Sequence, residues 1–193
     1  MEATSIRREV DLARERVVRD RASALAALND LFRRGVVPDP PLDGLYRGAL
    51  ITPSLTPLLD SLGRALTRVW LPWQGKTFDS ATQMGDNIFM NNGKWLARLI
   101  WPAYRGYIPD DPGRTRALQF RTYVGPGQHD LDRQVLKIDY DWEGNPRWPV
   151  RDVLDELVQI DAGYYLGKAL LRRRGRWVCA AYFALSSTLL RHS

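Results

Sequence analysis

The residues best suited to chemistry lie in two strand-like runs, 156–160 and 164–168, that a short turn separates. If the runs pair as a hairpin, strand alternation places Glu156 on one face with the apolar residues of its own run. A carboxylate that points inward among such neighbours must find a donor or stay protonated, and Lys168, the arginines and the Tyr165 hydroxyl can donate. The pattern indicates a ligand-binding or acid–base group at Glu156, with an outward charge or a structural ion pair as the alternative.

A second candidate is the run Trp73-Gln74-Gly75-Lys76-Thr77-Phe78, which Asp86 and Asn87 follow. Lys76 is one of four lysines in the chain. A partly desolvated lysine can pair with an anionic ligand or serve as a base, and exposure to solvent is the alternative. We therefore expect Trp73, Lys76 and Asn87 among the ligand-binding residues.

The chain holds seven tryptophans and eight tyrosines, among them Tyr46 and Tyr165. Such side chains combine apolar bulk with hydroxyl or indole donors, which suits a pocket for a flat or lipid-like molecule. Plain filling of the core is the competing interpretation.

Most familiar catalytic signatures are absent from the sequence. It has no phosphate-binding glycine loop with its lysine, no Gly-x-Ser-x-Gly elbow and no pair of cysteines. Of its two histidines, His192 lies at the terminus and His129 in a glycine-rich turn, so we expect no metal site and no cofactor. The single cysteine, Cys179, lies in an apolar run and cannot form an internal disulfide.

The net charge of +6 and the pI of about 9.7 raise the question of nucleic-acid binding, but the basic residues are spread along the chain. The dense cluster Arg172-Arg173-Arg174-Gly175-Arg176 lies between two strand-like runs, as expected of a solvated hairpin turn. No specific nucleic-acid partner is therefore expected. No apolar segment follows the charged N-terminus and no stretch approaches the roughly 18 apolar residues of a membrane span, so we expect a cytoplasmic protein.

An amphipathic helix is expected from about residue 5 to residue 34, because apolar side chains recur there at spacings of three, four or seven. Gly35 ends this helix, and a proline-rich linker leads to a strand at 44–51. A second helix is expected to begin at Thr56, which can cap it, and to stop before Pro72. Between Trp73 and Tyr107 the signal is mixed: residues 74–78 resemble a strand, whereas the apolar residues at 95–100 fit a short helix or another strand, and periodicity does not decide between these two.

The C-terminal part is more uniformly β, after a turn at 108–113 and with a short helical stretch expected at 149–154. The runs that read as strands are 116–124, 134–142, 156–160, 164–171 and 176–185. Consecutive antiparallel strands at this spacing predict a meander that curls or closes to protect its edges. The expected fold class is α+β: an antiparallel barrel or strongly curled sheet with an N-terminal helix and a helix inserted after the first strand. The expected parts are an N-terminal helix (1–34), a linker (35–43) and a barrel-like domain (44–193).

The run Gly44-Leu45-Tyr46-Arg47-Gly48, the helix after it and the run 73–78 together resemble the opening of small bacterial proteins named for a Gly-x-Trp-x-Gly motif. Tyr46 stands where that motif has tryptophan, and the resemblance covers about a fifth of the chain. Those proteins are similar to calycins, the lipocalin-like barrels that carry hydrophobic ligands. The resemblance implies a barrel with a ligand cavity and supplies no catalytic residue.

The function predicted from the sequence is binding of a small apolar or aromatic molecule inside a calycin-like barrel. The expected ligand-binding residues are Tyr46, Arg47, Trp73, Lys76, Asn87, Glu156, Tyr165 and Lys168. One alternative is a small isomerase or hydrolase in which Glu156 or Asp155 is the acid–base group and Lys76 or Arg47 stabilises an oxyanion. Another is an interaction module that uses the N-terminal helix toward a protein or a membrane, and the sequence leaves a homodimer open.

Overall fold

The structure, a computed structural model, describes residues 3–53, 73–90, 101–111 and 113–187. Within these ranges two helices open the chain, α1 (Ala3–Arg16) and α2 (Arg21–Arg34). The strands that follow are β1 (Gly44–Pro53), β2 (Trp73–Asp79), β3 (Met84–Met90), β4 (Ile108–Asp111), β5 (Arg114–Pro126), β6 (Gln134–Asp139), β7 (Val153–Asp161), β8 (Tyr164–Arg173) and β9 (Arg176–Ser187). A short 3-10 helix, η3 (Val150–Asp152), directly precedes β7. None of the helices in the described ranges has the length and apolar character needed to cross a membrane.

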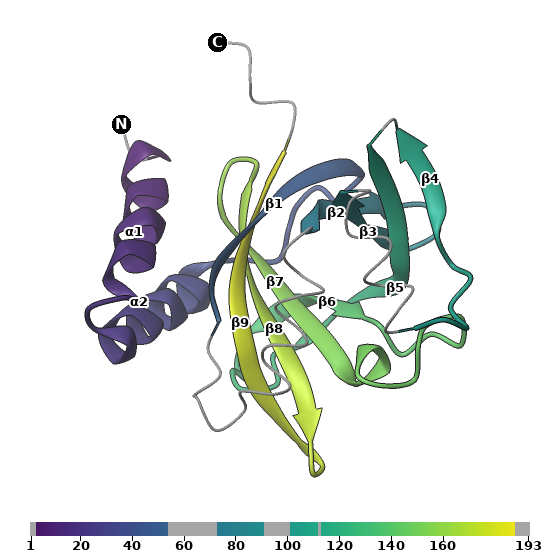
Figure 1. The fold of residues 1–193 in the computed structure, drawn as a ribbon. Helices are drawn as coiled ribbons and strands as arrows, with labels where there is room; N and C mark the ends of the chain where they lie inside the picture. The colour runs from purple at the N-terminus through teal and green to yellow at the C-terminus, as the bar shows by residue number, and fades with distance from the viewer. Residues whose placement is uncertain (1–2, 54–72, 91–100, 112, 188–193) are drawn as a thin grey trace.

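Eight of these strands form a closed antiparallel barrel (Figure 1). They pair in the order β1-β2-β3-β5-β6-β7-β8-β9, and β9 pairs with β1 to complete the ring. The remaining strand, β4, pairs only with β5. A closed ring leaves no unpaired strand edge within it, which is how small antiparallel folds avoid edge-to-edge association. The predicted fold class, α+β on an antiparallel barrel, is confirmed.

A two-residue turn joins β8 to β9, because Arg173 pairs with Arg176. Arg174 and Gly175 between them have φ of 49° and 76°. Positive φ at both central residues is what a type I′ hairpin turn requires, and its twist matches that of the strands it joins. The hairpin turn predicted at the arginine cluster is confirmed.

The N-terminal helix expected over residues 5–34 is divided into two helices. Asp20 ends the connection between them: its carboxylate accepts a hydrogen bond from the Ser23 amide at 3.1 Å and caps α2. The two helices pack against each other, and Arg34 at the end of α2 reaches Glu9 of α1 at 2.7 Å. Asp20, which lies within the stretch predicted as one helix, therefore marks the start of a second helix.

Several strand boundaries also differ from the prediction. Strand β4 occupies part of the predicted turn at 108–113, and β3 lies in the segment whose periodicity was mixed. The short helical stretch expected at 149–154 is reduced to η3, after which β7 begins three residues earlier than predicted. The helix expected between Thr56 and Pro72 lies outside the described residues.

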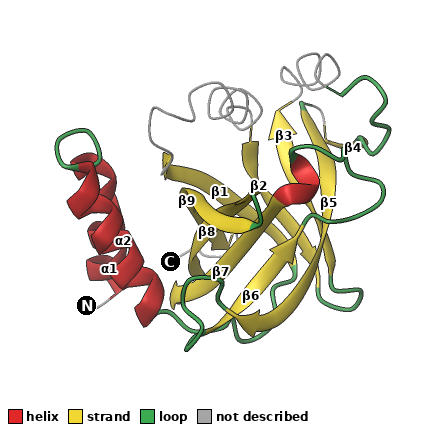
Figure 2. Cartoon of the chain, turned by 90° about the horizontal axis from the view of Figure 1, so that it is seen from below, coloured by secondary structure: helices red, strands yellow, loops and turns green. Residues whose placement is uncertain are grey.

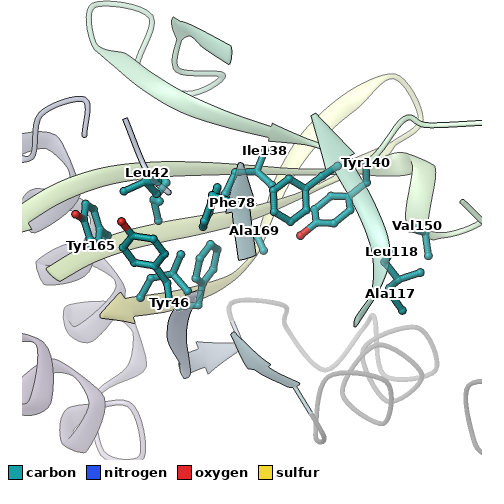
Figure 3. Close-up of a cluster of buried hydrophobic side chains, with 14 of the residues drawn as sticks. Leu42, Tyr46, Phe78, Ala117, Leu118, Ile138, Tyr140, Val150, Tyr165 and Ala169 are labelled. Atoms are coloured by element: carbon teal, nitrogen blue, oxygen red, sulfur yellow. The ribbon is translucent and has the colours of Figure 1, made fainter. Parts of the chain in front are cut away.

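Apolar clusters lie on both faces of the barrel wall. The inner cluster lies inside the barrel and includes Tyr46 and Phe78 (Figure 3). The outer cluster joins Leu28 and Phe32 of α2 to Val158 and other wall residues. Figure 2 shows both helices lying along one side of the barrel. The helices thus bury their apolar faces against the barrel of the same chain, and part of the wall is buried on both of its faces.

Candidate functional site

A cavity of about 50 Å³ lies inside the barrel, near the end of β1 and the start of β7. The described residues that line it are Leu50, Trp73, Lys76, Asn87, Phe89, Trp101, Leu118, Tyr140, Val150, Val153, Asp155 and Phe183. Nine of these residues are apolar or aromatic, and the other three, Lys76, Asn87 and Asp155, carry an ammonium, an amide and a carboxylate group. One water molecule needs about 10–15 Å³ of such space, so the cavity holds more than one water-sized group.

Lys76 of β2 is the centre of the polar groups at this cavity. Its Nζ lies 2.9 Å from Asp155 Oδ2 and 2.9 Å from Asn87 Oδ1, and it also donates to the Tyr140 hydroxyl. The Lys76 side chain is 3% exposed, so its ammonium has no access to bulk water. Each of its three donors has an acceptor, as a buried ammonium requires.

Three further hydrogen bonds fix the groups around Lys76. The Tyr140 hydroxyl donates to Asp155 Oδ2 at 3.0 Å. Asn87 Nδ2 donates to the Leu118 carbonyl at 3.1 Å, and Trp73 Nε1 donates to Asn87 Oδ1 at 3.1 Å. We call Trp73, Lys76, Asn87, Tyr140 and Asp155 the interior polar cluster.

Aromatic rings surround the ammonium of Lys76. Its Nζ lies 5.1 to 5.6 Å from the ring centres of Trp73, Phe120, Tyr140 and Phe183. Burial lowers the pKa of Lys76 below its ordinary value, although the Asp155 carboxylate opposes this change. Burial, together with the charge of Asp155, raises the pKa of Tyr140 well above 10, so its hydroxyl keeps its proton.

Asp155 accepts the hydrogen bonds of the cluster through one of its two carboxylate oxygens. Its Oδ2 receives Lys76 and Tyr140, whereas its Oδ1 is buried and has no hydrogen-bond partner among the described residues. The residue is 3% exposed and lines the cavity. A buried carboxylate oxygen without a partner is unfavourable, because it has lost water and gained no donor.

A second set of buried charges, which we call the outer polar cluster, lies on the other face of the wall. Glu156 is 0% exposed, and its Oε1 lies 2.5 Å from Lys137 Nζ. Its cross-strand partner Lys168 places Nζ 2.5 Å from Asp130 Oδ2 and 2.8 Å from Asn29 Oδ1 of α2. These contacts tie helix α2 to the barrel wall.

The structure brings three of the predicted site residues together at the cavity, namely Trp73, Lys76 and Asn87. Tyr46 and Tyr165 face the interior as well, but their rings pack edge to face with centroids 5.5 Å apart and they do not line the cavity. In Figure 3 they lie at the opposite end of the inner cluster from the cavity residues Leu118 and Val150.

The remaining predicted site residues lie outside the barrel. Arg47 is exposed, and Glu156 and Lys168 belong to the outer polar cluster. The inward orientation expected of Glu156 is corrected by the packing. Leu157 lies in the inner apolar cluster and Val158 in the outer one, so Glu156 points out beneath the elements that cover the wall.

Asp155 and Tyr140 are the members of the cluster that the sequence did not single out for binding, although Asp155 was considered as an acid–base group. Residues two apart on a strand face the same side, so Asp155 and Leu157 share a face. An assignment of Leu157 to the interior would therefore have placed Asp155 there as well. Tyr140 stands just beyond the end of β6 and is one of eight tyrosines, so its residue type alone does not distinguish it.

Comparison with known proteins identifies no family. No family description matches the chain, and no curated protein matches it. Among solved structures, the chain is similar to a protein from Thermomonospora curvata, with 14% identity over 90% of this chain and 97% of the other and a TM-score of 0.48.

Proposed function

We propose that this barrel binds a small apolar or aromatic molecule in its interior cavity. The observation that carries the proposal is the composition of the lining: among the described residues, nine apolar or aromatic side chains line a space at which Lys76, Asn87 and Asp155 converge. Ligand sites are typically built in this way, with apolar walls for affinity and a few placed polar groups for orientation.

The proposed site has aromatic walls and a polar floor. Trp73 and Phe183 meet edge to face with centroids 5.7 Å apart, and Phe89 and Trp101 complete the aromatic lining. A flat molecule gains apolar burial and ring contacts against such walls. Of the residues predicted from the sequence, the proposal retains Trp73, Lys76 and Asn87 as ligand contacts.

The connectivity of the barrel supports a calycin-like role in carriage, sensing or sequestration. Neighbouring strands in the ring also follow one another along the chain, except at the β9–β1 and β3–β5 pairs. Up-and-down ligand-binding barrels have this connectivity. Fold alone does not define function, so the proposal rests on the cavity.

The test is to measure binding and then fill the cavity. Purified protein is examined by native mass spectrometry for a co-purifying small molecule, and titrated with an environment-sensitive lipophilic dye. Val153→Phe adds bulk at a lining residue and should abolish dye binding, whereas Val124→Phe, at a position 55% exposed on β5, should not. Equal dye binding by both variants, with both folded by circular dichroism, would rule the cavity out as the binding site.

A second candidate function is a small acid–base enzyme of the isomerase or hydrolase type. The observation that favours it is the convergence of Lys76, Tyr140 and Asp155 on one cavity. Asp155 would accept and return the proton that moves during the reaction, and the charge of Lys76 would stabilise an oxyanion that develops on the substrate. Release of 4-nitrophenolate from 4-nitrophenyl acetate tests the hydrolase form: Asp155→Asn should remove it and the control Glu156→Gln should retain it. Equal rates in both variants would remove this candidate.

A further inference from the structure

The chemical class of the ligand follows from the hydrogen bonds that the interior polar cluster leaves unmade. Lys76 uses its three donors on Asp155, Asn87 and Tyr140. The Tyr140 hydroxyl donates to Asp155 Oδ2, and the Asn87 amide donates to the Leu118 carbonyl. In the described part of the cavity lining, the buried polar atom left without a partner is Asp155 Oδ1, which is an acceptor. A molecule that completes the cluster must therefore bring a donor.

The charge balance of the cavity restricts the ligand further. Lys76 and Asp155 form a pair whose Nζ and Oδ2 atoms lie 2.9 Å apart, and no other described lining residue carries a formal charge. A carboxylate ligand would meet the negative charge of Asp155, and an ammonium ligand would add an unbalanced positive charge beside Lys76. Either charge would be buried in an apolar site without a partner, which is strongly unfavourable.

Taken with the aromatic walls, the geometry points to a neutral ligand whose hydroxyl or N–H group donates to Asp155 Oδ1 while its apolar body lies against Trp73 and Phe183. This inference deepens the proposed function and rests on it. It excludes free fatty acids and amines as preferred ligands, and it favours neutral aromatic or alicyclic alcohols and amides.

Four compounds of nearly the same size test the inference. Toluene supplies the apolar body alone, benzyl alcohol adds a neutral donor, and benzylamine and benzoate carry a positive and a negative charge at pH 7. Each displaces the lipophilic dye from the purified protein in a competition titration. Benzyl alcohol should bind at least about tenfold more tightly than toluene, because a hydrogen bond to a charged acceptor is gained, and a tenfold ratio corresponds to about 1.4 kcal/mol. Both charged compounds should bind more weakly than toluene.

A pair of variants assigns the preference to Asp155. In Lys76→Met/Asp155→Leu the whole ion pair is replaced by apolar side chains of similar length, which keeps the site free of an unpaired charge. This variant should still bind toluene and should lose the preference for benzyl alcohol, while Glu156→Gln should keep the preference.

Each outcome of the titrations separates the inference from the proposed function. If toluene binds and benzyl alcohol binds no better, the inference fails and the proposed function stands. If the double variant keeps the preference, the donor is received elsewhere and the inference also fails. If Val153→Phe binds the dye as tightly as the wild-type protein and none of the four compounds displaces it, the proposed function itself fails.

Discussion

Asp155 and Glu156 are adjacent in β7, yet their carboxylates are buried on opposite faces of the barrel wall. Asp155 Oδ2 lies 2.9 Å from Lys76 Nζ inside the barrel, and Glu156 Oε1 lies 2.5 Å from Lys137 Nζ outside it. The two residues are 3% and 0% exposed. Each buried carboxylate has a lysine partner, because an unpaired charge in such a place costs several kcal/mol.

The first prediction concerns the pairing of Lys76 with Asp155. Lys76→Met should lower the free energy of unfolding by about 3–5 kcal/mol, because it leaves the Asp155 carboxylate buried without its cation. Adding Asp155→Leu should restore part of the loss, since the second substitution removes the stranded charge. Urea unfolding of the single and double variants measures both effects.

The neighbouring carboxylate provides the control for that experiment. Glu156 belongs to the outer polar cluster, so combining Lys76→Met with Glu156→Gln should add a further loss of stability instead of a recovery. Recovery with Glu156→Gln, or no recovery with Asp155→Leu, would contradict the assignment of the two pairs.

Much of the fold could be predicted from local patterns in the sequence. The turn at Arg174 and Gly175 and the strands on either side of it follow from turn chemistry and apolar runs. Strand β3 could not be predicted in this way, because its polar residues Asp86 and Asn87 are buried. Asn87 faces the cavity, and buried polar side chains break the alternation of apolar and polar residues on which strand prediction depends.

The site was harder to predict than the fold for a different physical reason. The wall at β7 is covered on both faces, by the barrel interior and by elements that include α2. Alternation separates Asp155 from Glu156 but does not say which of two buried faces is the inner one. Lys76 and Asn87, by contrast, lie opposite each other in the β2–β3 hairpin, where proximity in the sequence was a sufficient signal.

The second prediction concerns the close approach of Gly48 to Trp73. A Cβ atom at position 48 would lie 2.3 Å from the indole ring, so Gly48→Ala must displace Trp73. The displaced indole should lose its hydrogen bond to Asn87, with a stability loss of about 1–3 kcal/mol and weaker binding of the lipophilic dye. Gly125→Ala is the matched control, because the nearest atom to its Cβ would be 3.9 Å away. Dye affinity unchanged in Gly48→Ala would show that Trp73 does not shape the site.

The third prediction is a loss of stability at alkaline pH that depends on Tyr165. Burial, and next the neighbouring Tyr46, raise the pKa of Tyr165 to about 12, compared with 10 in the unfolded chain. Since the unfolded chain releases this proton first, the stabilisation is complete below pH 10 and is lost as the pH rises toward 12. Two pKa units correspond to about 2–3 kcal/mol.

Tyr165→Phe removes this titrating group. The free energy of unfolding of the variant should therefore fall less steeply between pH 10 and 12 than that of the wild-type protein, as urea denaturation measures. Below pH 9 the difference between the two proteins should be constant. Parallel curves over the whole range would mean that the hydroxyl is as accessible in the folded state as in the unfolded chain.

The fourth prediction concerns Asp130, which holds α2 to the barrel. Burial alone would raise the pKa of Asp130, but hydrogen bonds from Lys168 and Arg33 outweigh it and lower the pKa below its ordinary value of 3.8. Because the folded-state pKa is the lower one, the stabilisation is present above about pH 4 and is lost as the pH falls through that folded value. The wild-type protein should therefore keep the contribution of the Asp130 carboxylate at neutral pH and lose it as the pH falls below about 4.

Asp130→Asn should remove that contribution at neutral pH, at a cost of about 3 kcal/mol, since it leaves the Lys168 ammonium buried without its carboxylate. The backbone amides of α2 should then exchange with deuterium faster than those of β8, because the contact that ties the helix to the wall is weakened while the barrel remains closed. Asp141→Asn breaks an exposed pair with Arg151. It should change the free energy of unfolding by no more than about 1 kcal/mol and should not accelerate exchange in α2 relative to β8. Equal acceleration of exchange in α2 and β8 would mean that the helices and the barrel unfold as one unit, with Asp130 stabilising both.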